Sequence, residues 1–192
     1  MDKTASPHLI LGITGASGSL AAHRLLGKSP WPVDLVCSPW GKEVAKTECG
    51  GMKAIESLAH QVFAHDDLYA PLASGSVVYR GMVVLPCSVH TLAQIAAGLG
   101  DNLIIRAAHC QLKERRPLIL CLREAPMTLI DIDNARRAAQ AGAVIMPMSP
   151  PYFMFAGADP QSVTLIDLMD AFVDRILAFL GKPSAATWED VR

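Results

Sequence analysis

Short apolar runs alternate with longer segments of helical periodicity along almost the whole chain, and this alternation limits the possible folds most. The runs predicted as strands cover residues 8–13, 33–37, 81–85, 117–122 and 143–146. The segments predicted as helices cover residues 17–26, 39–48, 88–99, 102–115, 130–140 and 163–180. Nearly continuous apolar strands that alternate with helices indicate a parallel sheet covered on both faces. The predicted fold class is α/β, a Rossmann-like or flavodoxin-like three-layer sandwich with a mainly parallel sheet.

Length and composition limit the possible functions. The 192 residues predict a single domain over 1–192, with a core from about 8 to 180 and a C-terminal tail over 181–192. Apolar residues make up 51% and charged residues 18%, which excludes disorder. A net charge of −1 and one short basic run, residues 113–116, argue against a nucleic-acid partner.

The expected location and the expected absence of a bound metal rest on motifs that the sequence lacks. No stretch approaches the roughly 20 apolar residues of a transmembrane helix, and we find no secretory signal. The five cysteines form no C-x-x-C pair and the six histidines form no H-E-x-x-H motif. We therefore expect a cytoplasmic protein with no membrane partner and no bound metal.

Residues 12–18, with the sequence G-I-T-G-A-S-G, lie where the first strand turns into the first helix. Glycines let the backbone approach a phosphate, and the N–H groups of a helix start attract anions. The alternative is a tight turn with Ser17 as helix N-cap. Because Ser38 stands at the end of the second strand, where dinucleotide-binding proteins carry an acidic residue, a mononucleotide is the better prediction.

Two further strand ends carry polar groups. Ser88 and Thr91 lie one helical turn apart at the end of the third strand, and Arg123 and Glu124 follow the strand 117–122. Cys87 with His90 could form a nucleophile and base, against the alternative of a buried thiol and a surface histidine.

Several blocks of the sequence resemble the UbiX-type flavin prenyltransferases, within the wider superfamily of homo-oligomeric flavin-containing cysteine decarboxylase-like proteins. The blocks are I-T-G-A-S-G (13–18), A-S-G-S (73–76), L-P-C-S (85–88), R-A-A (106–108), L-K-E-R-R-P-L (112–118), R-E-A-P (123–126) and G-A-V-I-M-P (142–147). They extend over most of residues 8–180, and the K-E-R-R-P-L and R-E-A-P blocks are the most specific.

The resemblance implies a metal-free reaction in which the dimethylallyl group of dimethylallyl phosphate is joined to N5 and C6 of reduced FMN. The product, prenylated FMN, would serve a UbiD-type decarboxylase. Residues implied to contact FMN are Gly15, Ala16, Ser17, Ser38, Ser88, Val89, His90, Thr91 and Arg123. Residues implied to hold the prenyl phosphate are Lys113, Arg123 and Arg175. The implied catalytic residues are Glu48, Ser17 and Glu124.

One loop departs from the family pattern. The family carries a phosphate-binding tyrosine where this chain has Phe153, while Tyr152 lies one residue earlier. Either Tyr152 reaches the phosphate by a shift of register, or the donor or the activity differs. The alternatives are therefore an FMN-binding carrier or regulatory subunit that does not prenylate, and an FMN-dependent decarboxylase.

Assembly is the last expectation. The resemblance implies a homo-oligomer, a dodecamer in many members, with sites shared between subunits. Apolar segments outside the strands, residues 64–79, 148–155 and the tail with Trp188, are the predicted interface.

Overall fold

The computed structural model describes residues 7–183 and 189, and its centre is a parallel sheet. The strands run in the order β3-β2-β1-β4-β5-β6. Their bounds are β1 (Leu9–Ile13), β2 (Val33–Cys37), β3 (Gln61–Phe63), β4 (Gly81–Cys87), β5 (Leu118–Leu122) and β6 (Val144–Ile145). All five neighbouring pairs are parallel, which confirms the predicted α/β class.

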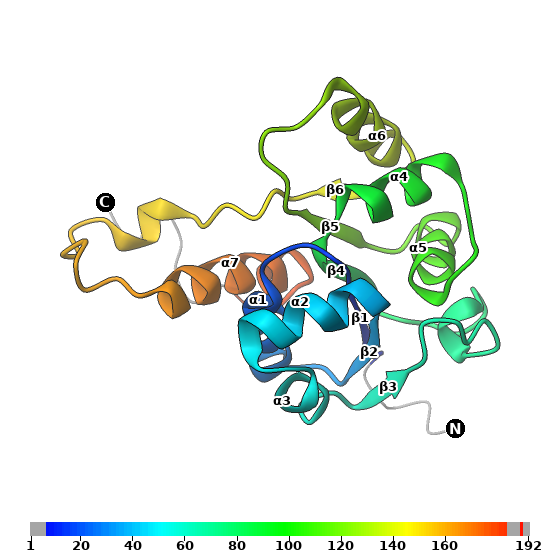
Figure 1. The fold of residues 1–192 in the computed structure, drawn as a ribbon, viewed down its shortest axis with the longest axis horizontal. Coiled ribbons are helices and arrows are strands. Elements are labelled where there is room, and N and C mark those ends of the chain that lie inside the picture. Colours follow the sequence, from blue (N-terminus) through cyan, green and yellow to red (C-terminus); the bar gives the residue numbers. More distant parts are fainter. Residues whose placement is uncertain (1–6, 184–188, 190–192) are drawn as a thin grey trace.

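Helices cover both faces of this sheet. They are α1 (Ser19–Lys28), α2 (Pro39–Cys49), α3 (Lys53–Glu56), α4 (Val89–Ala97), α5 (Leu103–Lys113), α6 (Leu129–Gln140) and α7 (Leu165–Phe179), with two 3-10 turns, η1 (Pro71–Ala73) and η2 (Tyr152–Phe155). Figure 1 shows α1 and α7 side by side, with α4, α5 and α6 grouped across the strands from them.

Alternation along the strands explains why both layers form. Leu9, Leu11 and Ile13 of β1 pack with α1 and α7, whereas Ile10 packs with α4 and α5 on the other face. All four side chains are fully buried. Because successive residues of a strand point to opposite faces, a fully apolar strand such as β1 needs a helical layer on each side.

The order of the strands places the ligand-binding edge. The chain passes outward through β2 and β3 on one side of β1 and then returns to β4 on the other side. In open α/β sheets the crevice for ligands lies at the carboxyl ends of the strands at such a reversal. The turns after β1 and β4 are therefore the expected site.

The sequence prediction missed two short elements, α3 and β3. Each has only three or four residues, and the β3 residues are largely exposed, so neither gives a strong hydrophobic period. Trp188, predicted to lie at an interface, falls outside the described residues. No helix in the described part of the chain is long and apolar enough to span a bilayer.

Candidate functional site

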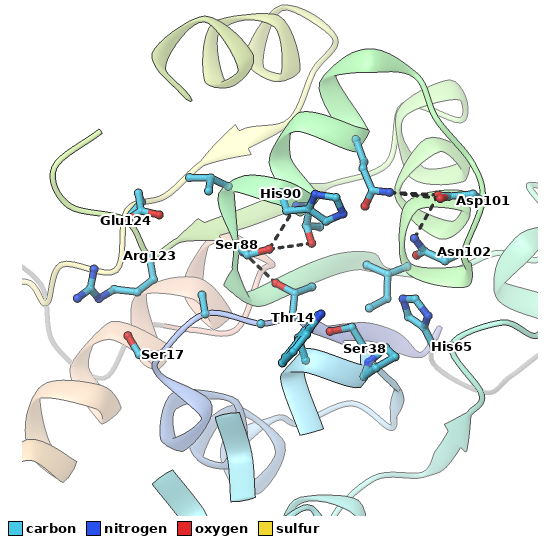
Figure 2. A pocket seen from close by; sticks show the side chains of 18 of the residues that line it. Thr14, Ser17, Ser38, His65, Ser88, His90, Asp101, Asn102, Arg123 and Glu124 are labelled. Carbon is cyan, nitrogen blue, oxygen red and sulfur yellow. Dashed lines mark hydrogen bonds between the residues drawn. The ribbon is translucent and has the colours of Figure 1, made fainter. Parts of the chain in front are cut away.

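A cavity of about 910 Å³ opens at the carboxyl edge of the sheet, between the ends of β1, β2, β4 and β5. Its lining includes ten residues predicted as site residues: Gly15, Ala16, Ser17, Ser38, Ser88, Val89, His90, Thr91, Arg123 and Glu124. In Figure 2, Arg123, Glu124 and Ser17 lie at one end of the cavity, and Ser38, His65 and Asp101 lie at the other. The strands thus bring together residues that are more than a hundred positions apart in the sequence.

The turn after β1 forms the floor of this cavity. A Cβ on Gly15 would lie 2.6 Å from the Cβ of Trp40, so the bare backbone is needed at that approach. Thr14 is buried, and its hydroxyl donates to the Pro86 carbonyl at 2.9 Å and accepts the Ser88 N–H at 2.9 Å. This pair of hydrogen bonds fixes the turn after β1 against the turn after β4.

Three helices begin at the cavity. Ser38 caps α2 by accepting from the Gly41 N–H, Ser88 caps α4 by accepting from the Thr91 N–H, and Asn102 caps α5 by accepting from the Ile105 N–H. The Ser88 hydroxyl also bonds the Thr91 hydroxyl, so the predicted shared face of these two residues is confirmed. Converging helix N-termini favour an anionic ligand.

The start of α1 is capped differently from the predicted alternative. Its N-cap is Gly18, with φ of 118°, and Ser17 makes no capping hydrogen bond, so Ser17 as N-cap was wrong. Instead the Glu48 carboxylate, at the end of α2, accepts the Gly18 N–H at 2.9 Å and the Ser19 N–H at 2.8 Å. The exposed Glu48 side chain is therefore held at the start of α1, next to Ser17, although it does not line the cavity.

Arg123 and Glu124 leave β5 directly into the cavity and are exposed. The Arg123 N–H donates to the Cys87 carbonyl, which places the residue at the end of β4. No residue that the structure describes forms a hydrogen bond or ion pair with its guanidinium group. A guanidinium is suited to bind a phosphate by two parallel hydrogen bonds.

The pairing of Cys87 with His90 as nucleophile and base is contradicted. The Cys87 thiol is completely buried, which raises its pKa to about 12. A thiol with such a pKa is not ionised near neutral pH and is a poor nucleophile. Cys87 is therefore the buried thiol of the alternative interpretation, and His90 is exposed at the cavity.

Four predicted residues lie outside the cavity lining: Glu48, Lys113, Tyr152 and Arg175. Lys113 ends α5, and because α5 begins at the cavity with Asn102, its last residue lies about 15 Å away along the helix axis. There Lys113 pairs with Glu114, and the neighbouring Arg116 donates to the carbonyls of Gly75 and Val77. The A-S-G-S and K-E-R-R-P-L blocks therefore pack together at the opposite end of α5.

Tyr152 and Arg175 are exposed on the C-terminal part of the chain. Tyr152 lies in η2, in the arm that projects beside α7 in Figure 1, and Phe153 is half-buried there. The arm starts next to the glycine turn, since a Cβ on Gly18 would lie 2.6 Å from the Met148 Cε. Neither Tyr152 nor Phe153 reaches the cavity lining of the same chain.

The structure adds lining residues that the motifs did not indicate. They are Thr14, Pro39, Trp40, His65, Asp66, Gln94, Asp101, Asn102, Ile104 and Ala125. Burial lowers the pKa of His65 and so favours its neutral form. Of these residues only Thr14 and Ala125 lay inside recognised motifs; His65 and Asp101 come from loops whose positions depend on tertiary packing.

A flavin mononucleotide fits this site by size and chemistry. Ligand pockets commonly enclose about 300–1,000 Å³. The helix starts at Ser38 and Ser88 offer N–H and hydroxyl groups to a phosphate, and the glycine turn allows close backbone approach. Trp40, which is 75% exposed, adds an apolar surface at the same mouth.

Comparison with known proteins agrees with this geometry. The model of the Flavoprotein family matches residues 1–176. The flavin prenyltransferase UbiX of Methanocaldococcus jannaschii is 39% identical over 176 residues, which cover 90% of this chain and 92% of that protein.

Two solved structures share the fold. AnUbiX (PadA1), solved in complex with FMN and dimethylallyl pyrophosphate, superimposes with a TM-score of 0.86 at 34% identity and covers 95% of this chain and 97% of its own. A dodecameric FMN-dependent UbiX-like decarboxylase from Escherichia coli O157:H7 has a TM-score of 0.85 at 32% identity, over 94% of this chain and 98% of its own. The chain therefore belongs to the Flavoprotein family and, within it, to the UbiX flavin prenyltransferases.

Proposed function

We propose that this chain joins the dimethylallyl group of dimethylallyl phosphate to N5 and C6 of reduced FMN and supplies the prenylated FMN to a UbiD-type decarboxylase in the cytoplasm. One observation carries the proposal: a single cavity combines helix starts suited to the flavin phosphate with a guanidinium at its other end, that of Arg123, which has no partner among residues 7–183 and 189. The similarity to UbiX proteins supports it.

The side chains in and beside the cavity can each be assigned a role in this reaction. Ser38, Ser88 and Thr91 would bind FMN, which when bound supplies the ring atoms that are alkylated. Arg123 would stabilise the negative charge that develops on the departing phosphate. Glu48, held by two N–H groups beside Ser17, and Glu124, next to Arg123, are carboxylates that can take up a proton or stabilise positive charge on the allyl group.

The placement of Lys113 supports a site completed by a second subunit. If Lys113 binds the prenyl phosphate, it must come from another copy, because in its own chain it lies at the far end of α5. Exposed apolar side chains are available for such contacts, including Tyr69 and Tyr152 in the predicted interface segments and Leu129 and Ile130 on α6. We therefore propose a homo-oligomer with shared sites, with the dodecamer as the expected form.

The function is tested by the mass of the flavin after anaerobic incubation of the protein with reduced FMN and dimethylallyl phosphate. We expect a flavin heavier by one five-carbon unit. Arg123→Ala should abolish the adduct, whereas Arg136→Ala, whose side chain pairs with Asp133 on α6, should retain it. No adduct with either the mono- or the diphosphate donor would refute the proposal.

Shared sites are tested by co-expressing Lys113→Ala and Arg123→Ala chains that carry different tags. Each variant alone should be inactive, and random mixing should restore about a quarter of the sites. A mixed oligomer with no activity, although Lys53→Ala oligomers are active, would rule out sites shared between subunits, and an active Lys113→Ala oligomer would place Lys113 outside the reaction.

A second candidate is a flavin carrier or FMN-dependent decarboxylase that does not prenylate. It is favoured by one observation, the phenyl ring of Phe153 at the family tyrosine position, since a phenyl ring donates no hydrogen bond to a phosphate. Tight FMN binding without turnover, unchanged in Phe153→Tyr, would support this candidate.

A further inference from the structure

Two histidines and a buried aspartate meet at the edge of the sheet opposite the cavity. His8 precedes β1, Asp34 is the second residue of β2, and His60 precedes β3. Figure 1 shows these three strands side by side. Each residue is 26 positions from the next, so the three residues form no local sequence motif. The expectation of no bound metal rested on local motifs and therefore could not take this group into account. We call His8, Asp34 and His60 the amino-edge cluster.

Backbone hydrogen bonds fix the amino-edge cluster in place. The His60 N–H donates to the Val33 carbonyl at 2.8 Å, and the His8 carbonyl accepts the Arg80 N–H at 2.9 Å. In the sheet register Asp34 pairs with Ile10 on one side and with Gln61 on the other. Both histidines therefore flank Asp34 because of strand pairing, not because of flexible loops.

The Asp34 carboxyl group is incompletely satisfied. Its side chain is only 5% exposed. His8 Nδ1 and the Tyr79 hydroxyl both lie 3.2 Å from Oδ2, while Oδ1 is buried without a hydrogen-bond partner among the described residues. A buried carboxylate oxygen without a donor is unfavourable, and a cation is the partner that satisfies it best.

The imidazole groups are placed as ligands. One nitrogen of each histidine and one Asp34 oxygen lie within 4.8 Å of one another. Two ligands of a tetrahedral Zn²⁺ ion, each about 2.1 Å from the metal, are about 3.4 Å apart, close to the 3.2 Å between His8 Nδ1 and Asp34 Oδ2. The His60 ring packs edge-on against His8 with centroids 4.4 Å apart, and its ligand nitrogen lies within 4.8 Å of the other two ligand atoms.

A simple ion pair between His8 and Asp34 explains the arrangement less well than a metal site does. An ion pair with His8 would engage Asp34 through Oδ2 alone and leave Oδ1 unpaired, whereas a metal ion held by both carboxylate oxygens would satisfy Oδ1 as well. Two neutral imidazoles and a carboxylate match the ligand chemistry of zinc, and the exposed His60 gives the ion a path of entry.

We propose that the amino-edge cluster is a zinc site that joins the starts of β1, β2 and β3, with water as the fourth ligand. Tyr79 would orient the carboxylate by donating to Oδ2, as residues behind metal ligands commonly do. The site lies apart from the cavity and is independent of the prenyl-transfer function. Its effect would be to stabilise β3, a three-residue edge strand.

The test is calorimetric titration of Zn²⁺ into the full-length protein after dialysis against a chelator. We expect one ion per chain and a raised melting temperature. His60→Ala should weaken binding at least about tenfold, and its exposed position makes a folded variant the expected result. The matched control is His23→Ala on α1, which should bind zinc as the wild type does. Circular dichroism checks that both variants fold.

Two further readouts separate this site from binding elsewhere. Co²⁺ should give the visible bands of tetrahedral coordination without the charge-transfer band of a thiolate, and Cys49→Ser should leave binding unchanged. Hydrogen exchange of the Val62 and Phe63 amides should slow when zinc is added. No binding, thiolate bands, or wild-type affinity in both His60→Ala and His8→Gln would overturn the proposal.

Discussion

Thr14→Val tests whether the cavity floor is held by the hydroxyl that joins the turns after β1 and β4. Valine has nearly the shape of threonine but removes both hydrogen bonds, so the Ser88 N–H loses its acceptor and the Pro86 carbonyl loses one donor. Each net hydrogen bond contributes about 1 kcal/mol, and a polar group left unpaired at a buried site adds to the loss. We expect a loss of about 2–3 kcal/mol in the free energy of unfolding.

The assay is urea denaturation of Thr14→Val beside two controls. Thr14→Ser keeps the hydroxyl and removes one buried methyl group, so it should lose only about 0.8 kcal/mol. Thr47→Val lies on the exposed face of α2 and should change stability by less than about 0.5 kcal/mol. FMN should also bind more weakly to Thr14→Val, because the start of α4 is no longer held. A Thr14→Val variant as stable as Thr14→Ser would refute this reasoning.

Three other predictions concern the surrounding structure. Gly41→Ala should destabilise the folded protein by about 1–3 kcal/mol, because the added Cβ would lie 2.8 Å from the Ile13 carbonyl oxygen. Gly27→Ala on α1 places its Cβ in open space and should stabilise the folded protein by about 0.5–1 kcal/mol. Thermal melts of the two variants beside the wild type test both values. Glu48→Ala should cost about 1 kcal/mol by removing the cap of α1, measured by urea denaturation. The Arg24 guanidinium on α1 donates to both carboxylate oxygens of Asp170 on α7, at 2.6 and 2.7 Å, and lowers the pKa of Asp170. This ion pair therefore stabilises the fold at pH values above the unfolded aspartate pKa of about 3.9. Its contribution is lost as the pH falls through the lower pKa of Asp170 in the folded state. The stability difference between wild type and Asp170→Asn, about 1 kcal/mol at neutral pH, should therefore vanish in acid; a constant difference would contradict the assignment.

The sheet and its binding edge could be predicted because they depend on local patterns. Runs such as Leu9–Ile13 are apolar at every position, and parallel strands bring the turns that follow them to one edge. The glycine turn, Ser38, Ser88 and Arg123 each follow a strand directly, so their meeting in one cavity followed from topology.

Other parts depend on contacts between distant segments, and sequence patterns do not encode these. His65 and Asp101 enter the cavity from loops, and Glu48 caps a helix that begins thirty residues earlier. Lys113 was assigned to the phosphate by resemblance, yet the helix that carries it leads away from the cavity. A single chain therefore shows only part of the site that we propose.

The stoichiometry of phosphate release tests the central claim most directly. If FMN and dimethylallyl phosphate react in this protein, each flavin that gains the five-carbon unit must be accompanied by one inorganic phosphate, measured in the same anaerobic reaction. We predict equal amounts of the two products over the time course, and neither product with Arg123→Ala. Phosphate released without a flavin adduct, or tightly held FMN with neither product, would contradict the account.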